Sequence, residues 1–178
     1  MGIRQHLQQL ESENLVEPLA PVAQPRGRPV RTWQLTSAGH ARFPDAHASV
    51  TAEIIASVRD LLGEDSLDQI IRHRGEQSYQ HYLAGVGAES SLQARVIALA
   101  RLRTEEGYMA DVQLVSEHEV LLIENHCPIC IAAKSCQGFC RNELDTFRRL
   151  LGENTTVERE EYLLAGGRRC TYRIRQHD

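Results

Sequence analysis

The sequence has no apolar run long enough to cross a membrane, which takes about 20 consecutive residues. Apolar runs such as Val120-Leu121-Leu122-Ile123, within the segment 119–123, have only the length of a strand. A secretory signal peptide is also missing, because the first residues turn polar too soon after Met1. We therefore expect a cytoplasmic protein with no membrane association.

Lysine is almost absent, since Lys134 is the one lysine among 20 basic residues. The 24 acidic residues exceed the basic ones and give a net charge of −4. This balance excludes a generally basic nucleic-acid binder, although a local basic patch remains compatible with it.

Several signatures of enzymes are missing as well. The sequence has no Gly-x-Ser-x-Gly motif, no phosphate-binding loop and no glycine-rich dinucleotide fingerprint. We therefore expect no enzymatic activity. The chain does have 178 residues, of which 42% are hydrophobic, and these suffice for one compact domain or two small ones.

Hydrophobic periodicity predicts an α+β fold. Apolar residues at helical spacing predict helices over residues 2–13, 50–62, 66–86, 92–102 and 143–151. Alternating or continuous apolar residues predict strands over residues 15–16, 31–35, 108–115, 118–124, 157–164 and 168–175, which would form a small antiparallel sheet in the second part. We divide the chain into residues 1–47 and residues 48–178.

The five cysteines are clustered, with the spacing Cys-x2-Cys-x5-Cys-x3-Cys-x29-Cys. An odd number of cysteines in a cytoplasmic chain argues against a disulfide framework. Thiolates are soft ligands that suit iron–sulfur clusters and zinc. Cys127 and Cys130 could chelate one centre, and so could Cys136 and Cys140 if they shared a helical turn. Cys170 lies on the inward face of its predicted strand and could close the site.

Other interpretations of these cysteines remain open. They could be small buried hydrophobic residues, or they could hold a structural zinc ion. The strand at residues 120–123, followed by Cys127-Pro128-Ile129-Cys130, superficially resembles the redox motif of thioredoxin, so a thiol oxidoreductase is a further alternative. His126 could be a ligand, although its position beside Cys127 is equally compatible with a solvent-exposed side chain.

Residues 1–47 read as a helix, a strand, a basic loop, a second strand and a second helix. This order resembles the second half of a winged-helix DNA-binding domain of the ArsR/DeoR type. The resemblance is carried by residues 4–16, by Gly27-Arg28-Pro29, by Trp33-Gln34-Leu35-Thr36 and by Gly39. It implies that Arg4 and Gln5 read bases from a recognition helix. It also implies that three wing arginines contact the DNA backbone or minor groove: Arg26, Arg28 and Arg31.

The cysteine segment resembles the sensor domain of SufR-like regulators, which repress iron–sulfur assembly operons and bind a cluster. The matching residues are Asn125-His126-Cys127-Pro128, Ala132-Ala133, Cys140-Arg141-Asn142-Glu143-Leu144, Leu151-Gly152, Gly166 and Cys170-Thr171-Tyr172-Arg173-Ile174. The resemblance implies a redox-sensing repressor whose cluster is held by Cys127, Cys140 and Cys170. We take Cys130 as the fourth ligand, with Cys136 as the alternative, and zinc as the alternative to the cluster.

The same resemblance implies a homodimer that binds a palindromic operator in double-stranded DNA. The predicted helix 50–62 carries Ile54, Val58 and Leu61, which suit a dimer interface. A winged helix normally has two helices before its recognition helix, so we expect the domain to be truncated at its N-terminus. Its helix would then expose Ile3, Leu7 and Leu10.

Overall fold

The computed structural model describes residues 2–19, 32–42 and 46–177. The chain divides into two compact units, residues 1–47 and residues 48–178, which are treated separately below. The described residues contain seven α-helices and two antiparallel sheets, so the predicted α+β class is confirmed. The roles predicted for the two parts stay predictions.

The first unit contains two helices and a two-stranded sheet. They are α1 (Ile3–Ser12), β1 (Val16–Pro18), β2 (Trp33–Leu35) and α2 (Ser37–His40). The strands pair antiparallel, with Val16 opposite Leu35. Thr36 caps α2, because its hydroxyl accepts a bond from the Gly39 amide at 3.0 Å and donates one to the Asn14 carbonyl at 2.6 Å. Thr36 therefore connects the turn that follows α1 to the beginning of α2.

Within the described part of this unit, Val16 is the one buried large apolar side chain. Ile3 on α1 is 82% exposed, and Leu10 lies on the margin between half-buried and exposed. The expectation that α1 leaves apolar residues exposed is thus confirmed for Ile3, while Leu7 is half-buried.

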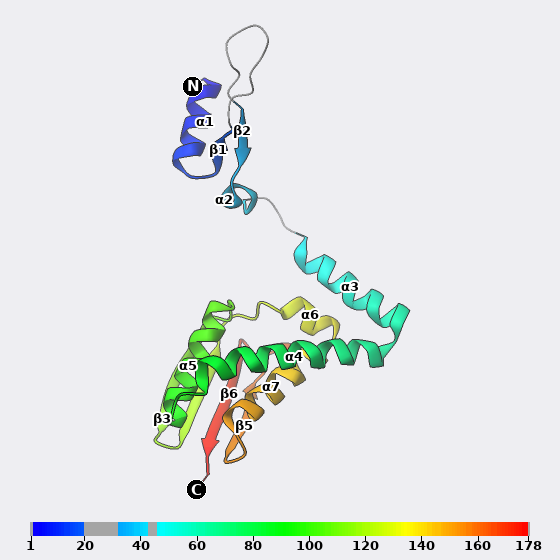
Figure 1. Ribbon diagram of the computed structural model, residues 1–178, viewed down its shortest axis with the longest axis vertical. Coiled ribbons are helices and arrows are strands. Elements are labelled where there is room, and N and C mark those ends of the chain that lie inside the picture. Colours follow the sequence, from blue (N-terminus) through cyan, green and yellow to red (C-terminus); the bar gives the residue numbers. More distant parts are fainter. Residues whose placement is uncertain (1, 20–31, 43–45, 178) are drawn as a thin grey trace. The chain divides into compact units, whose positions relative to one another are not determined.

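The second unit begins with three helices, α3 (His47–Leu62), α4 (Glu64–Val86) and α5 (Leu92–Glu105). The hairpin β3 (Ala110–Ser116) and β4 (Glu119–Glu124) follows, then α6 (Cys130–Ser135), α7 (Gly138–Leu151), β5 (Thr155–Glu161) and β6 (Cys170–Gln176). The four strands form one antiparallel sheet in the order β3-β4-β6-β5 (Figure 1). None of the helices described is long and apolar enough to span a bilayer.

Glycines end two of these helices where the sequence predicted. Gly63 separates α3 from α4 with φ +83°, and Gly152 follows α7 with φ +89°. Residues with a side chain rarely adopt such backbone φ angles, so glycine permits the sharp change of direction at both points.

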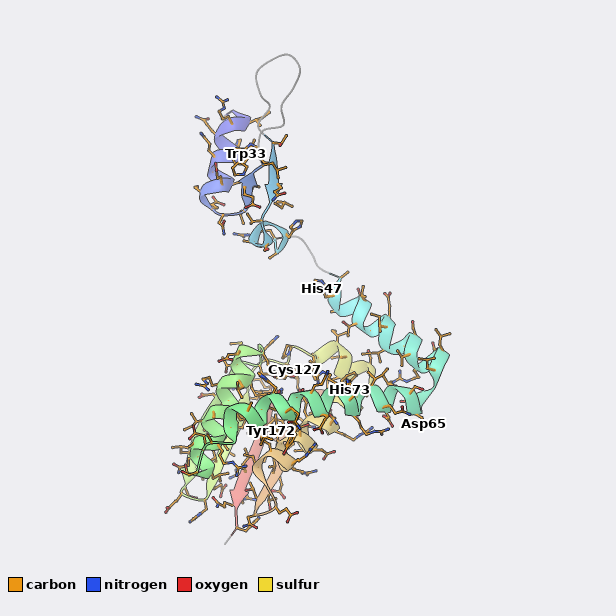
Figure 2. The ribbon with its side chains drawn as sticks, in the orientation of Figure 1. Trp33, His47, Asp65, His73, Cys127 and Tyr172 are labelled. Carbon is orange, nitrogen blue, oxygen red and sulfur yellow. The ribbon has the colours of Figure 1, made fainter. Side chains whose placement is uncertain are left out.

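The main core lies between the sheet and helices α4, α5 and α7. Its fully buried members include Val96, Leu99, Leu122, Phe147 and Ile174. Tyr172, labelled in Figure 2, belongs to it as well, and the rings of Phe147 and Tyr172 meet edge to face at 5.2 Å between centroids. Burial of these side chains stabilises the layer of helices against the sheet.

A second, smaller core joins α3, α4, α6 and α7, and we call it the α6 cluster. Its buried members are Ile55, Leu67, Ile71, Ala132, Cys136 and Phe139. Val58 of α3 packs against this cluster, whereas Ile54 and Leu61 are 57% and 81% exposed. Of the three residues expected at a dimer interface, Val58 is therefore used inside the unit, and the dimer stays a prediction.

The helices around the cysteines differ from the prediction. Residues 130–135 form the unpredicted α6, and α7 begins at Gly138 rather than at residue 143. Short helices such as α6 carry too few apolar positions to show a helical period. The earlier start of α7 has a consequence for chemistry, because it places Cys140 on a helix.

Candidate metal centre

Backbone hydrogen bonds fix the chain where it leaves β4. The Asn125 amide and side chain both donate to the Met109 carbonyl, at 3.3 and 3.2 Å. The His126 amide donates to the Tyr108 carbonyl at 3.0 Å. These bonds hold the start of the cysteine segment beside the start of β3, and Cys127 follows directly on the loop that leads to α6 (Figure 2). The His126 side chain is exposed.

Cys127 and Cys130 stand at the two ends of a turn. The Cys130 amide donates to the Cys127 carbonyl at 3.2 Å, and Cys130 is the first residue of α6. Both side chains are half-buried. A Cys-x2-Cys turn of this kind brings two thiols to one side of the backbone, as chelation requires.

Cys140 and Cys170 approach from α7 and β6. Cys140 lies in the first turn of α7, and Cys170 is the first residue of β6. Since β4 and β6 are antiparallel, Cys170 lies opposite Glu124, the last residue of β4, and at the sheet end from which the Cys127 loop emerges. Both cysteines are buried, as the inward position of Cys170 in its strand predicted.

The four thiols are electrostatic neighbours. Burial raises the pKa of Cys127 to about 12, and the nearby charges of Glu143, Cys130, Cys140 and Cys170 contribute to the increase. Burial also raises the pKa values of Cys140 and Cys170. These thiols are therefore protonated at neutral pH in the metal-free protein, and each would lose its proton on binding a metal.

The arrangement is that of neighbouring thiols rather than a closed set of ligands. Within the described ranges, no three His, Cys, Asp or Glu side chains are already grouped so as to hold a metal ion. Binding would have to draw the four sulfur atoms together. Donors that come from a turn, a helix and a strand, and that are partly open to solvent, are suited to a thiolate-bound centre.

Cys136 lies apart from this group. It is buried in the α6 cluster with Ala132 and Phe139, and Arg59 of α3 donates to the neighbouring Ser135 carbonyl at 3.1 Å. Cys136 ends α6 with an extended backbone, so it does not share a helical turn with Cys140. The condition for a chelating pair of Cys136 and Cys140, a shared helical turn, is therefore not met, and the choice between Cys130 and Cys136 as fourth ligand stays a prediction.

A buried ion cluster holds in place the elements on either side of the cysteine segment. The Arg103 guanidinium, 1% exposed, donates from Nε to Glu124 at 2.7 Å and from Nη2 to Glu143 at 3.1 Å. Its Nη1 donates to the Tyr82 hydroxyl at 2.9 Å, and the Tyr108 hydroxyl donates to Glu143 at 2.5 Å. Glu124 lies three residues before Cys127, and Glu143 one helical turn after Cys140, so Arg103 fixes the elements that carry both cysteines.

Arg159 of β5 is a second arginine at the site. Its Nη2 donates to the Cys140 carbonyl at 2.7 Å and to the Tyr172 hydroxyl at 3.3 Å. Its charge acts to lower the pKa values of Cys140 and Cys170, although burial outweighs this effect. Tyr162 forms a hydrogen bond with the Cys140 thiol, which also acts to lower that pKa.

Sequence reasoning missed both arginines, although each carried a signal. Arg103 continues the spacing of Leu92, Val96 and Leu99, so it occupies the apolar stripe of its helix. Arg159 follows the inward-facing Val157 by two residues and therefore shares its face of the strand. A charged residue on a buried face was the signal to use in each case.

Three arginines in or directly before β6 have carboxylate partners and therefore do not form a free anion-binding patch. Arg173 pairs with Glu119 and Glu160. Arg175 pairs with Glu158 at 3.2 Å, and Arg169 pairs with Glu161 at 3.1 Å. Because β6 lies between β4 and β5, these are cross-strand ion pairs on one face of the sheet.

The predicted DNA-contacting residues are described only in part. Arg4 and Gln5 lie in the first turn of α1 and are exposed. The Gln5 side chain accepts a bond from the Gly2 amide at 3.1 Å, so it caps the helix in this state. Arg26, Arg28 and Arg31 lie outside the described residues.

No model of a known protein family matches the chain, and no curated protein does. Solved structures with similarity to the chain include subunit 3 of the trafficking protein particle complex from Naegleria fowleri, covalently bound to palmitic acid. It has a TM-score of 0.48 and 11% identity, and the match covers 74% of this chain and 95% of that one.

Two other solved structures are similar to the chain. The phenol-responsive sensory domain of the transcription activator PoxR has a TM-score of 0.46 and 13% identity, covering 98% of this chain and 90% of its own. The H-NOX domain of SO2144 from Shewanella oneidensis has a TM-score of 0.40 and 11% identity, covering 75% and 78%. At these scores the similarities identify neither a family nor a function for this chain.

Proposed function

We propose that the protein is a transcriptional regulator whose unit 48–178 senses redox or iron–sulfur status through a thiolate-bound centre. The ligands are Cys127, Cys130, Cys140 and Cys170, and the regulated partner is double-stranded DNA. The observation that supports the proposal is that Cys127 lies within electrostatic influence of Cys130, Cys140 and Cys170, which come from separate elements, while Cys136 is packed in the α6 cluster.

An iron–sulfur cluster is the first candidate for the centre. Four cysteine thiolates are the usual ligands of such clusters, and the motifs around Cys127, Cys140 and Cys170 resemble those of SufR-like regulators. A zinc ion held by four cysteines is the second candidate, in which case the unit would be a metal-stabilised binding module with no sensing role.

The surroundings of the site provide a way to transmit its state along the chain. Cys130 begins α6, and Ala132 of α6 is buried in the same cluster as Ile55 of α3. Ligation would therefore tie the loop, α7 and β6 together and hold α6 in place against α3, which leads in sequence to the first unit. Release of the thiols would free α6, which is the kind of two-state element that regulation requires.

The DNA-binding part of the proposal has its support in the first unit. A helix followed by a two-stranded antiparallel sheet and a capped second helix is the element order of the recognition helix and wing of a winged-helix domain. The exposed Arg4 is compatible with a contact to DNA.

A thiol oxidoreductase, the enzymatic alternative, is disfavoured by the surroundings of Cys127. Such enzymes need a thiol of lowered pKa that is a thiolate at neutral pH. Burial raises the pKa of Cys127 instead, and that of Cys140 and Cys170 as well.

The test is purification of the protein without oxygen, followed by an absorption spectrum and by iron, sulfide and zinc analysis. We expect a brown protein with broad absorption near about 400 nm and with iron and sulfide in similar amounts. Cys127→Ala, Cys130→Ala, Cys140→Ala and Cys170→Ala should each lose the colour or bind the centre weakly. Cys136→Ala is the matched control, because it removes a buried cysteine of the same segment, and it should stay brown.

Three results would change the conclusion. A colourless protein with one zinc per chain would replace sensing by structural metal binding. Loss of the centre in Cys136→Ala but not in Cys130→Ala would exchange the fourth ligand. A wild-type protein without metal under these conditions would contradict the proposed centre.

The regulatory part has its own measurement. Brown and metal-free protein would each be incubated with a pool of random double-stranded DNA, and the bound fraction sequenced. We expect enrichment of a palindromic site by one of the two forms, with an affinity difference of about 5- to 150-fold between them. Equal enrichment by both forms, or none by either, would contradict the regulatory proposal.

A further inference from the structure

The Arg159 side chain leaves one buried donor without a partner. Its Nη2 has two acceptors, the Cys140 carbonyl and the Tyr172 hydroxyl, and its guanidinium carbon lies 4.6 Å from the ring centroid of Tyr162 and 5.1 Å from that of Tyr172. Its Nε is buried and has no hydrogen-bond partner, and within the described residues it is the one buried side-chain nitrogen or oxygen in this condition.

Such a donor is costly unless something accepts its proton. An unpaired buried polar group carries a penalty of about 1–3 kcal/mol, and more when it is charged. Arginine cannot relieve the penalty by deprotonation, since its guanidinium stays charged in proteins. The position is therefore informative, because native structures pair nearly all their buried donors.

Two of the proposed ligands lie on the elements that Arg159 contacts. Its guanidinium is bonded to the Cys140 carbonyl, and Arg159 pairs across the sheet with Tyr172, two residues after Cys170 on β6. Its charge also acts on the pKa values of both thiols. The unpaired Nε donor therefore lies in the part of the unit that carries Cys140 and Cys170.

We propose that Arg159 is a positioning residue of the centre, whose Nε donates a hydrogen bond to a sulfur atom of the group that Cys140 and Cys170 bind. The inference rests on the proposed function and adds to it an electrostatic partner that is not itself a ligand. The accepting sulfur is a cysteine thiolate or, in a cluster, an inorganic sulfide.

Charge explains why such a partner is needed. Four thiolates carry more negative charge than a zinc ion or an oxidised cluster core supplies as positive charge, so the bound centre is an anion. Glu124 and Glu143 add carboxylates on the side of Arg103, which already pairs with both. A cation with a free donor beside Cys140 and Cys170 offsets the remaining charge, and hydrogen bonds to sulfur raise the reduction potential of a cluster.

The test compares Arg159→Gln and Arg159→Lys with the wild-type protein, all purified without oxygen. Glutamine keeps an N–H donor but removes the charge, whereas lysine keeps the charge but loses the planar group that bonds Cys140 and Tyr172. Arg101→Gln is the matched control, because Arg101 is exposed on α5 and its loss removes the same charge. The readouts are the reduction potential from a potentiometric titration and the rate at which a chelator removes iron.

We expect Arg159→Gln to hold the centre about 10- to 100-fold more weakly and to have a more negative reduction potential, because reduction adds an electron to a site that has lost a positive charge. Arg159→Lys should have a potential closer to that of the wild type but should lose iron faster. Arg101→Gln should match the wild type in both. Far-ultraviolet circular dichroism of the metal-free forms would show whether each variant is folded.

The outcomes separate this inference from the proposed function. A folded Arg159→Gln with wild-type potential and iron retention would overturn the role of Arg159 and leave the centre itself intact. If the glutamine variant does not fold, a lysine variant that equals the wild type in both readouts would overturn it in the same way. For protein that contains no cluster, cobalt(II) titration of the thiols gives the same comparison through its thiolate absorption. A wild-type protein that binds neither iron nor cobalt would overturn both proposals.

Discussion

Arg103 is the residue on which the buried ion cluster depends. It holds Glu124 and Glu143, which are 4% and 7% exposed, through bonds of 2.7 and 3.1 Å. Because Arg103 is the cation between them, its loss would leave two carboxylates without their main partner in an apolar surrounding. The sheet, α5 and α7 would then lose the ion pairs that connect them at this point.

We therefore predict that Arg103→Ala lowers the free energy of unfolding by about 3–5 kcal/mol, the usual cost of removing one partner of a buried ion pair. Urea unfolding followed by circular dichroism would measure it. Arg101→Ala is the control, since Arg101 is exposed on the same helix and should change stability by less than about 0.5 kcal/mol. A similar loss in both variants would mean that the buried ion pairs of Arg103 add nothing to what an exposed arginine of the same helix contributes.

The stability loss in Arg103→Ala should depend on pH. Burial raises the pKa of Glu124 even in the presence of Arg103, and removal of the cation raises it further. A carboxyl group with a higher pKa in the folded than in the unfolded state takes up a proton on folding, so its effect favours the folded state at low pH and is lost as pH rises through the folded pKa. The deficit of the variant should therefore be smaller at about pH 5 than at about pH 8. A deficit that grows on acidification would contradict this assignment.

The raised pKa values of the thiols lead to a prediction about proton release on metal binding. Burial raises the pKa of Cys127 to about 12 and raises those of Cys140 and Cys170, so metal binding at neutral pH must displace protons from them. We expect zinc added to metal-free protein to release roughly four protons per ion and to bind more tightly as pH rises. Calorimetry in buffers of different ionisation enthalpy would count the protons. The same count in Cys136→Ala, and a lower one in Cys170→Ala, would agree with the assigned ligands.

At the scale of single residues, the sequence indicated the cysteines but not their supports. Clustering alone indicated thiol chemistry for the five cysteines, and the resemblance to SufR-like regulators then singled out Cys127, Cys140 and Cys170, with Cys130 or Cys136 as the fourth ligand. It could not place Cys136, whose separation from the others follows from the end of α6 in an extended residue. The roles of Arg103 and Arg159 could not be predicted from the sequence for another reason. An arginine gains its role here from burial, and burial is a property of the fold.

At the scale of elements, the close approach of α4 and α7 holds Cys140 in its place. Gly75 of α4 faces Asn142, which lies two residues after Cys140 on α7. A β-carbon at Gly75 would lie 1.9 Å from Asn142 Oδ1, so any side chain at position 75 would have to displace the side chain of Asn142.

We predict that Gly75→Val displaces Asn142, strains the contact between α4 and α7 and lowers stability by about 1–3 kcal/mol, as overpacking does. It should also weaken metal binding, since the first turn of α7 carries Cys140. Gln77→Val introduces valine at an exposed position of the same helix and should cost less, although valine is a weaker helix former than glutamine and a better one than glycine. Thermal unfolding and metal content would be measured on all three proteins. Equal losses in the two variants would contradict a specific role of the contact with Asn142.

The elements themselves could be predicted where a period was long enough to count. Apolar residues at helical spacing predicted α3, α4 and α5, and the alternation of apolar and polar residues predicted β6. Gly63 and Gly152 marked two helix ends. The helices within residues 128–142 could not be predicted from the sequence, because α6 has only six residues and shows no helical period. The sheet order β3-β4-β6-β5 could not be derived either, since it depends on which strands pair after α7 has crossed the unit.

At the scale of the whole molecule, the two units differ in how they are stabilised. Both hydrophobic cores are built from side chains between Ile55 and Ile174, all of which lie in the second unit. Among the described residues of the first unit, Val16 is the one buried large hydrophobic residue. The energy of apolar burial is therefore concentrated in residues 48–178.

We predict that a protein consisting of residues 48–178 folds by itself and keeps the centre. Its melting temperature should lie within about 4 °C of that of the whole chain, which corresponds to about 1 kcal/mol at this size. Thermal unfolding and metal analysis of the two proteins would test this. If residues 48–178 hold the centre but no longer select DNA, then sensing and DNA recognition are divided between the units as proposed. A shortened protein that aggregates or loses its metal would instead show that the cysteine site needs the first unit, and the transmission of its state could not then be confined to α6 and α3.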